Sequence, residues 1–467
     1  MGVAPVPAEP DVVESKGSEP EGAAPGDSVG PPWVRPAAAV VMAISASAAV
    51  WTLSRYPRVH DGSIAAQPDS PQVAATIVLA VVAVMALAVL MFRPERGSLR
   101  SLVATAVTWS IALLVALTIA WSAIAGSERQ DRWHGTPVAS VAEADAYLAR
   151  HVPAGLDPIR IPTGVIIQSM EFLNGDNVQV AGFVWQRYGP DVPSDLDRGV
   201  VLVEAVQEAY DTTEAYRYEE NGVETVGWYF AATLRQPFEY AEFPFDEQDL
   251  WLRMWSRDFS RDIILVPDFA SYYSLDATAL PGVESEFVYS GWSPVYSGFS
   301  FSEQPYNTSF GIGDAGQYQE FPELYFNLVL DRDFAGPFFE YLIFAIAVSF
   351  LLFGLLALTT DDEKLKTRFQ LSTAQVLLAA SGLLFAVILK HNQLREVVGA
   401  PGVSYIEVIP IVLYGVIVVV VLNAILTASP VNVRFLAHRN NLWPALAYWP
   451  VLLGLLLAVT LVVFFRA

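Results

Sequence analysis

The sequence predicts a membrane protein of the α+β class, in which about three transmembrane helices precede an extracytoplasmic β-sandwich and a four-helix transmembrane domain follows it. Three observations lead to this prediction. The chain of 467 residues is 53% hydrophobic and its mean hydropathy is +0.39, which is high for a soluble protein. Its long apolar runs form one group of three and one group of four. Between the groups lie about two hundred residues in which Tyr, Phe, Trp and Val are frequent.

The composition excludes several classes of chemistry. The chain has no cysteine, so it can form neither a disulfide nor a zinc–thiolate site. Its formal net charge of −22 argues against a nucleic-acid partner, because such a partner needs clustered Lys and Arg. We find no phosphate-binding loop, metal-ligand cluster or nucleophile motif, and the five histidines are scattered. We therefore expect no enzyme, no cofactor and no bound metal.

Composition also divides the chain into four regions. Residues 1–36 are rich in Pro, Gly, Ala and Glu, cannot bury a core and are predicted to form a disordered cytoplasmic tail. A three-span membrane module is expected at 37–126. The β-domain then occupies 127–335, and the four-helix transmembrane domain occupies 336–467.

Seven apolar runs come close to the roughly 20 residues that a helix needs to cross a bilayer. They are Ala37–Leu53, Val73–Phe92, Leu102–Ala125, Phe338–Leu358, Leu371–Leu389, Tyr405–Leu426 and Leu442–Phe465. Three of the connecting loops carry basic residues, and with seven spans these three loops fall on one side; the residues are Arg93, Arg96, Arg100, Lys364, Lys366, Arg368, Arg434 and Arg439. The positive-inside rule makes that side cytoplasmic. We therefore expect a multi-pass protein with a cytoplasmic N-terminus and an extracytoplasmic β-domain and C-terminus.

The segment between the third and fourth runs is predicted to be β-structure after a short helix at Val141–Arg150. Val178–Trp185 and Leu324–Leu330 alternate between two faces, as strands do. Turns are expected at Asn174-Gly175-Asp176 and at Asn221-Gly222. Strands with this spacing favour a β-sandwich, which by itself is compatible with an outer domain of any task.

Four short motifs resemble a known family. Phe243-Pro244-Phe245-Asp246, followed by Gln248, resembles the signature loop of the pentameric ligand-gated ion channels, or Cys-loop receptors. Gln236 and Leu250 stand where animal members have cysteines, and the prokaryotic branch also lacks those cysteines. Three further stretches resemble the end of the family's second strand, its last strand and the start of its pore helix; they are Phe183–Gln186, Leu324–Arg332 and Arg368–Ser372.

The resemblance covers about residues 155–465 and implies a ligand-binding-like β-domain and a channel-like helical domain. It implies a homopentamer in the bacterial plasma membrane that conducts an inorganic ion in response to an unknown small-molecule ligand or a proton. The chain departs from the family in its three-span N-terminal module. The Trp that many animal binding sites carry has no match here, since Arg257 lies near that position and Trp255 is two residues away.

The resemblance also implies a set of residues that couple the two domains. They are Phe243, Pro244, Phe245, Asp246, Arg332 and Pro401. In the family, the acid that matches Asp246 and the Arg that matches Arg332 meet at the junction with the membrane. We therefore expect these two side chains to lie within salt-bridge distance and to be largely shielded from water.

The predicted pore helix runs from Arg368 to Lys390. Steps of four and three residues select one face, which is polar at its start and apolar further on; its members are Gln370, Ala374, Leu377, Ser381, Leu384 and Ile388. In a ring of five, Leu377 would form a hydrophobic constriction, and the resemblance matches Leu377 to the family's gate leucine. The helix alone fits slightly better a packed bundle in which Ser and Gln bond across helices. The order of the elements favours the pore.

Two aromatic runs supply candidate ligand-binding residues. Their members are Tyr216, Tyr218, Trp228, Tyr296, Tyr306 and Tyr318. The last two lie in a loop at Ser297–Phe321, and the family holds its ligand between subunits under such a loop. Sandwich core and surface loop are the alternative roles. For the whole chain, the alternative to a channel is a non-conducting membrane sensor or accessory protein on the same fold.

Overall fold

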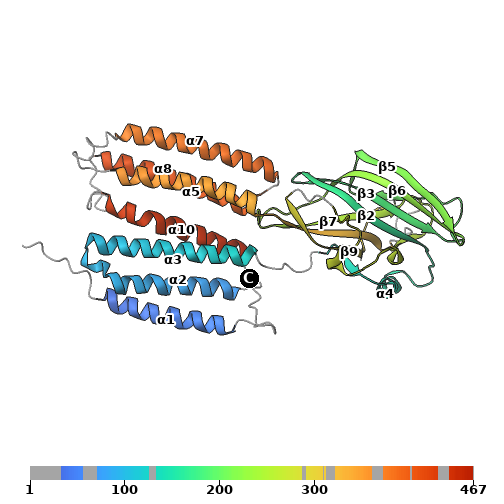
Figure 1. The fold of residues 1–467 in the computed structure, drawn as a ribbon, viewed down its shortest axis with the longest axis horizontal. Helices are drawn as coiled ribbons and strands as arrows, with labels where there is room; N and C mark the ends of the chain where they lie inside the picture. The colour runs from blue at the N-terminus through green and yellow to red at the C-terminus, as the bar shows by residue number, and fades with distance from the viewer. Residues whose placement is uncertain are drawn as a thin grey trace, which may run out of the picture.

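The computed structural model describes residues 33–55, 71–125, 133–286, 291–308, 310–311, 321–359, 372–399, 402–429 and 441–465. A layer of long helices forms one end of the molecule and two β-sheets form the other (Figure 1). Seven helices in the described residues are long and apolar enough to cross a membrane. The protein is therefore a multi-pass membrane protein with both helices and sheets, as predicted.

All seven predicted spans are helical. Their observed bounds are α1 Val34–Arg55, α2 Pro71–Phe92, α3 Leu99–Ala125, α5 Ala335–Leu358, α7 Thr373–Val398, α8 Val408–Ala428 and α10 Leu442–Phe464. Short 3₁₀ turns precede α3 at Pro94–Arg96 and α8 at Tyr405–Glu407. The first helix begins inside the predicted tail, most of which lies outside the described residues.

The predicted limits of the pore helix are wrong at its far end. The described part of α7 begins at Thr373, where Ser372 and Gln375 form a capping box. The helix continues past Lys390 to Val398 and ends at Gly399, whose φ of 60° is in the left-handed region that favours glycine. Hydropathy missed the last turns because the residues after Leu389 are mostly polar.

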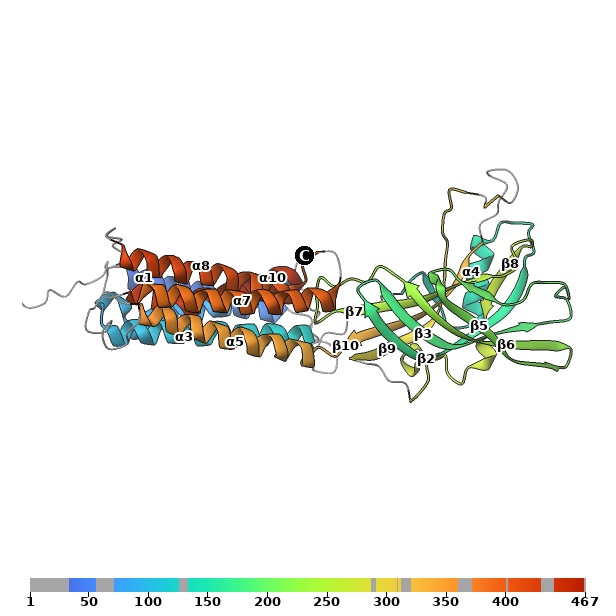
Figure 2. The ribbon, with the colours of Figure 1, turned by 90° about the horizontal axis from the view of Figure 1, so that it is seen from above.

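The helices follow one another across the layer in an order that differs from the chain order (Figure 1). Helix α1 contacts α2, α2 contacts α3, and α3 packs along α10. Helix α10 in turn contacts α5 and α8, and α7 lies on the far side against α8 and α5. Seen from above, all the helices run roughly along the long axis of the molecule, with the sheets beyond their ends (Figure 2). The N-terminal helices are therefore joined to the rest through α3.

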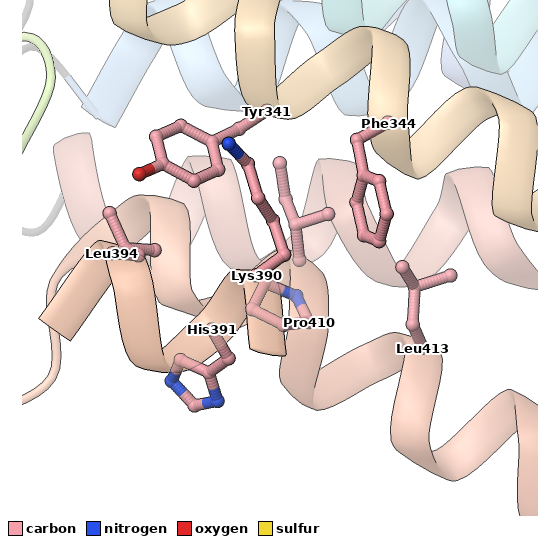
Figure 3. Close-up of a pocket in the computed structure, with 8 residues that line it drawn as sticks. Tyr341, Phe344, Lys390, His391, Leu394, Pro410 and Leu413 are labelled. Carbon is pink, nitrogen blue, oxygen red and sulfur yellow. The ribbon is translucent and has the colours of Figure 1, made fainter. Parts of the chain in front are cut away.

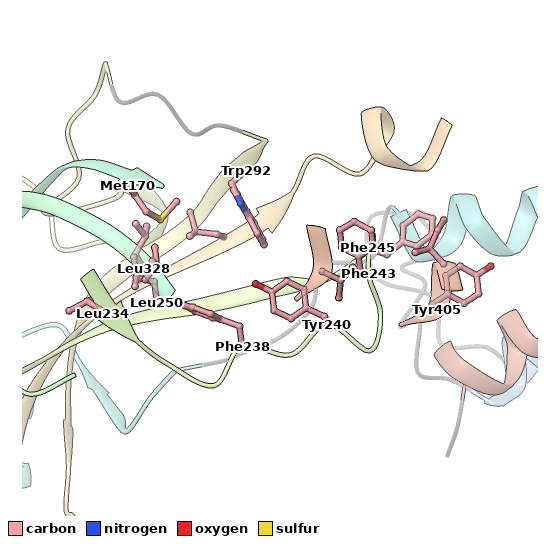
Figure 4. Packing of buried hydrophobic residues seen from close by; sticks show 14 of the residues in the cluster. Met170, Leu234, Phe238, Tyr240, Phe243, Phe245, Leu250, Trp292, Leu328 and Tyr405 are labelled. Atoms are coloured by element: carbon pink, nitrogen blue, oxygen red, sulfur yellow. The ribbon is translucent and has the colours of Figure 1, made fainter. Parts of the chain in front are cut away.

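The described residues of the β-domain form two five-stranded sheets, with strand orders β1-β9-β10-β7-β4 and β5-β6-β3-β2-β8. The bounds are β1 Thr136–Val138, β2 Ile159–Asn174, β3 Asn177–Tyr188, β4 Val200–Leu202, β5 Ala205–Glu220, β6 Val223–Arg235, β7 Glu247–Ser256, β8 Ile263–Pro267, β9 Trp292–Ser302 and β10 Glu323–Arg332. Apolar side chains from both sheets pack together, as Figure 4 shows for Met170, Leu234, Leu250 and Leu328. The predicted short helix is present as α4, Val141–His151.

Both predicted turns are confirmed as hairpins. The turn at Gly175 joins β2 to β3. Asn221 and Gly222 join β5 to β6 with φ values of 52° and 74°, the positive values that a tight two-residue hairpin turn requires.

Strand β10 is buried on both faces, so the alternation in its sequence does not appear as alternating exposure. Leu324 to Leu330 are all buried. The segment before β1 covers one face: the His134 ring stacks on Trp251, with ring centres 4.5 Å apart, and lies tilted against Tyr325, with ring centres 4.7 Å apart. Both sides of the strand that leads into the helices are thus held in place.

Candidate functional site

The strongest candidate site is the junction where the β-domain meets the helices. The loop between β6 and β7 reaches the helix ends with Phe243, Pro244 and Phe245 all buried. The Phe245 ring centre lies 5.3 Å from that of Phe338 and 5.8 Å from that of Phe464, which places it between α5 and α10. We use the name junction for Ala241–Asp246, Phe334, Phe338, Tyr405, Ile406 and Phe464.

The backbone of the loop is also bonded to the connection between α7 and α8. The amide of Tyr405 donates to the carbonyl of Ala241 at 2.8 Å, and that of Ile406 donates to Phe243 at 3.2 Å. Pro401, predicted to take part in coupling, lies outside the described residues. The loop is therefore held against α5 and α10 by ring packing, and against the connection between α7 and α8 by main-chain hydrogen bonds.

The predicted contact between Asp246 and Arg332 is confirmed. Arg332 Nε lies 2.6 Å from Asp246 Oδ1, and Nη2 lies 2.9 Å from Oδ2. The two side chains are only 13% and 2% exposed, so the pair is largely shielded from water. The guanidinium also lies over the Trp292 ring, 4.0 Å from its centre, and over Phe243 at 4.7 Å. A bidentate pair held between two rings fixes the end of β10 to the loop.

A second contact at the junction was not predicted. The β2–β3 turn rests on the end of α7, because a Cβ added at Gly175 would lie 2.7 Å from the backbone carbon of Gly399. Any side chain at Gly175 would push the turn away from the helix. Glycines have no side chains, so no pattern in the sequence predicts this contact. Only the turn itself could be predicted.

The predicted pore face lies on one flank of α7. Ala374 and Ser381 are exposed, Leu377 and Leu384 are partly buried, and Ile388 is 38% exposed. The side buried within the chain is formed by Val376, Ala380, Val387, Leu394 and Val398. The most open side carries Leu378, 75% exposed, and Phe385, 63% exposed. Gln370 lies outside the described residues.

A small cavity lies between α5, α7 and α8 near the junction (Figure 3). It is lined by Tyr341, Phe344, Lys390, His391, Leu394, Ile409, Pro410 and Leu413. Lys390 extends over the Tyr341 ring, with Nζ 4.6 Å from the ring centre, and forms an ion pair with Glu340. His391 is partly buried, and its Nδ1 lies 3.1 Å from the Tyr414 hydroxyl oxygen.

The aromatic ligand candidates do not gather in one place within the chain. Tyr216 and Tyr218 lie on β5, 40% and 54% exposed, while Trp228 on β6 is buried. Tyr296 on β9 is buried and stacks on Trp133. Tyr318 lies outside the described residues. Tyr216 and Tyr218 form one group, with ring centres 6.2 Å apart, and Tyr306 belongs to a second group on the other sheet.

The group on the first sheet centres on Arg253. Its guanidinium binds Glu323, with Nε 2.5 Å from Oε2, and hydrogen bonds to the Tyr306 hydroxyl. It also lies 5.4 Å from the centre of the Trp255 ring. Trp255 packs edge-on against Tyr306 at 5.9 Å and against Phe310 at 5.8 Å. Trp255 therefore packs at the centre of this aromatic cluster.

His134 should make the β-domain sensitive to acid. Burial and the nearby Arg253 lower its pKa below 6.5. The unfolded chain therefore takes up a proton at a higher pH than the folded protein does, and stability is lost as the pH falls below 6.5. His134→Phe keeps the ring stacking and removes the proton site. Between pH 7.5 and 5.5 its melting temperature should fall less than that of the parent. His151→Phe, on α4, serves as the control, and an equal fall in all three proteins would contradict the assignment.

The junction brings together residues that lie far apart in the chain, and these contacts identify it as the candidate site. No known family model matches the sequence, and no curated protein matches it. A function for this chain must therefore come from its own residues and their contacts.

Proposed function

We propose that the chain is a subunit of a bacterial pentameric ligand-gated ion channel with an additional N-terminal three-span module. In this proposal the two sheets form an extracytoplasmic β-sandwich that senses a stimulus. The last four long helices form the channel domain, and α7 lines the pore. The N-terminus is cytoplasmic, and the loop between α7 and α8 faces the β-domain outside the cell.

The observation that carries the proposal is the buried joint between Asp246 and Arg332. Packed side chains and hydrogen-bonded networks that connect a sensor domain to a pore can carry the coupling between the two. Here the last strand ends in Arg332, which is held to the loop by two charge-assisted hydrogen bonds and leads directly into α5. The loop in turn bonds to the connection that follows α7. A movement of the sheets would therefore be passed on to the start of α5 and to the connection that follows α7.

The exposed sides of α7 also support a ring. An inner helix must pack on its own subunit, pack on a neighbouring copy and face the axis. Leu378 and Phe385 would supply the neighbour contact. The flank with Ala374, Leu377 and Ser381 would face the axis; around the helix, Leu377 lies about 100° from Leu378, Ser381 about 60° and Ala374 about 40°. The Ser381 hydroxyl bonds to the Leu377 carbonyl at 2.8 Å, so it needs no partner from another helix.

The two aromatic groups fit a ligand site shared by two subunits. Strand β5, with exposed Tyr216 and Tyr218, is one of the two edge strands of its sheet. In a ring it would face the Trp255 and Tyr306 cluster of the next copy. A small molecule enclosed there would contact aromatic rings from both sides. A proton is the alternative stimulus.

The assembly provides the first test. Particles of the purified protein should have a mass of about five times 51.0 kDa, plus the detergent, and electron microscopy should show five-fold symmetry. Leu378→Glu would place a charge in the proposed subunit contact and should shift the particles to smaller assemblies. Leu173→Glu, an exposed apolar position in the β-domain, is the control. A monomer or dimer as the main species of the unaltered protein would rule out the channel.

A non-conducting sensor on the same fold is the second candidate. The partial burial of Leu377 and Leu384 is compatible with it, because a packed helix that lines no pore explains that burial as well as a pore does. Current through the purified protein in a planar bilayer separates the two functions. Five-fold particles that carry no current under any stimulus or pH would favour the sensor.

A further inference from the structure

Within the described residues, Trp121 connects the N-terminal helices to the junction. Trp121 lies near the end of α3, and its ring packs edge-on against Phe338 at 4.9 Å. Its indole nitrogen donates a hydrogen bond to the Tyr405 hydroxyl at 2.6 Å. These contacts connect the module formed by α1, α2 and α3 to two members of the junction.

The Tyr405 hydroxyl sits in a chain of hydrogen bonds whose direction the geometry determines. Thr460 has one hydroxyl proton, which it donates to the carbonyl of Leu456 at 2.8 Å. Tyr405 must therefore donate its own proton to Thr460, 2.7 Å away, and accept the indole proton from Trp121. Tyr405 is 5% exposed and Thr460 is fully buried. Removing the indole donor would leave a buried hydroxyl without one of its partners.

Tyr405 is also the residue whose backbone holds the loop of the β-domain. Its amide donates to Ala241, as described above, and its ring packs edge-on against Phe464 at 4.8 Å. One residue thus takes a side-chain bond from α3 and gives a main-chain bond to the loop. A shift of α3 relative to α10 would change the position of Tyr405 and with it the position of the loop.

We propose that the three N-terminal helices form a regulatory module that acts on the junction through Trp121. A module that served only as an anchor would need no contact other than apolar contact with lipid. This one instead sends a polar donor into a buried network and packs a continuous apolar stripe of α3 into the core of the chain; the stripe is Leu113, Ala116, Leu117, Ala120 and Ile124. Trp121 is a positioning residue, and the bond it makes sets how firmly the loop is held. The inference goes beyond the proposed function and does not require the protein to conduct.

Hydrogen–deuterium exchange on the full-length protein tests this inference. Trp121→Phe removes the indole donor and keeps an aromatic ring. The backbone amides of Tyr405 and Ile406 should then exchange about fivefold faster, which corresponds to the loss of one net hydrogen bond. Tyr405→Phe should have an equal or larger effect. Adding Trp121→Phe to Tyr405→Phe should cause no further increase, because Trp121 acts through that hydroxyl.

Trp109→Phe is the matched control. Trp109 lies on the same helix, and its indole nitrogen donates to the Met85 carbonyl at 3.0 Å within the module. Its loss should leave exchange at Tyr405 and Ile406 unchanged. Unchanged exchange in Trp121→Phe, an equal increase in Trp109→Phe, or additive effects in the double variant would each overturn the proposal. If Trp121→Phe does not fold, amide exchange in Tyr405→Phe is compared with that in the double variant Tyr405→Phe, Trp121→His, and this comparison decides the same point.

Discussion

Arg332→Ala should destabilise the junction by about 3–5 kcal/mol, because it leaves the Asp246 carboxylate buried without its partner. Asp246 is 2% exposed and would keep only the amide of Gln248, 2.8 Å from Oδ2, among its side-chain partners described here. For a domain of this size, such a loss corresponds to a melting temperature lower by roughly 10 °C. Thermal unfolding of the purified protein, followed by intrinsic fluorescence, measures the change.

Two controls separate the buried pair from the loss of charge in general. Arg217 pairs with Glu214 and Glu224 on an exposed part of β5 and β6, so Arg217→Ala should change the melting temperature little. Arg332→Lys keeps the charge but can neither make the bidentate contact nor stack flat on Trp292, and should give an intermediate result. Equal melting temperatures for Arg332→Ala and Arg217→Ala would show that the pair contributes nothing.

Leu377→Ser should raise the resting current by at least about tenfold or shift activation to weaker stimuli. If Leu377 forms a hydrophobic ring in five copies, the serine hydroxyl wets the constriction and lowers the barrier to ions. The expected effect is large because each leucine that is replaced removes roughly 1.5–3 kcal/mol of apolar burial from the constriction. Single-channel recording in a planar bilayer provides the measurement.

Leu378→Ser is the control for the gate, because a step of about 100° turns this residue away from Leu377. Its effect on current should be much smaller. Since Leu378 is the more exposed of the two side chains, its replacement should instead weaken assembly. A larger current from Leu378→Ser would mean that α7 faces the axis with its most open side. Silence from both variants would mean that α7 lines no pore.

The sequence alone predicted those features that depend on residues close together in the chain. The seven spans follow from the length and apolarity of each run. The hairpin at Asn221-Gly222 follows from turn residues that tolerate positive φ. The pairing of Asp246 with Arg332, 86 residues apart, was predicted only because the motifs around them resemble a family in which the matching residues meet.

Contacts between distant segments were decided by the tertiary structure. Gly175 and Gly399 meet without any side chain that could announce it. Trp121 and Tyr405, 284 residues apart, are ordinary interfacial aromatics in the sequence, since an indole donor does not specify its acceptor. The sequence also does not predict which side chains of α7 are buried, since Leu377 and Leu378 are identical residues with different surroundings. Local propensity and hydropathy set which segments become helices and strands. Which of their polar groups and small residues meet depends on packing across the whole molecule, because each buried group must find its partner there.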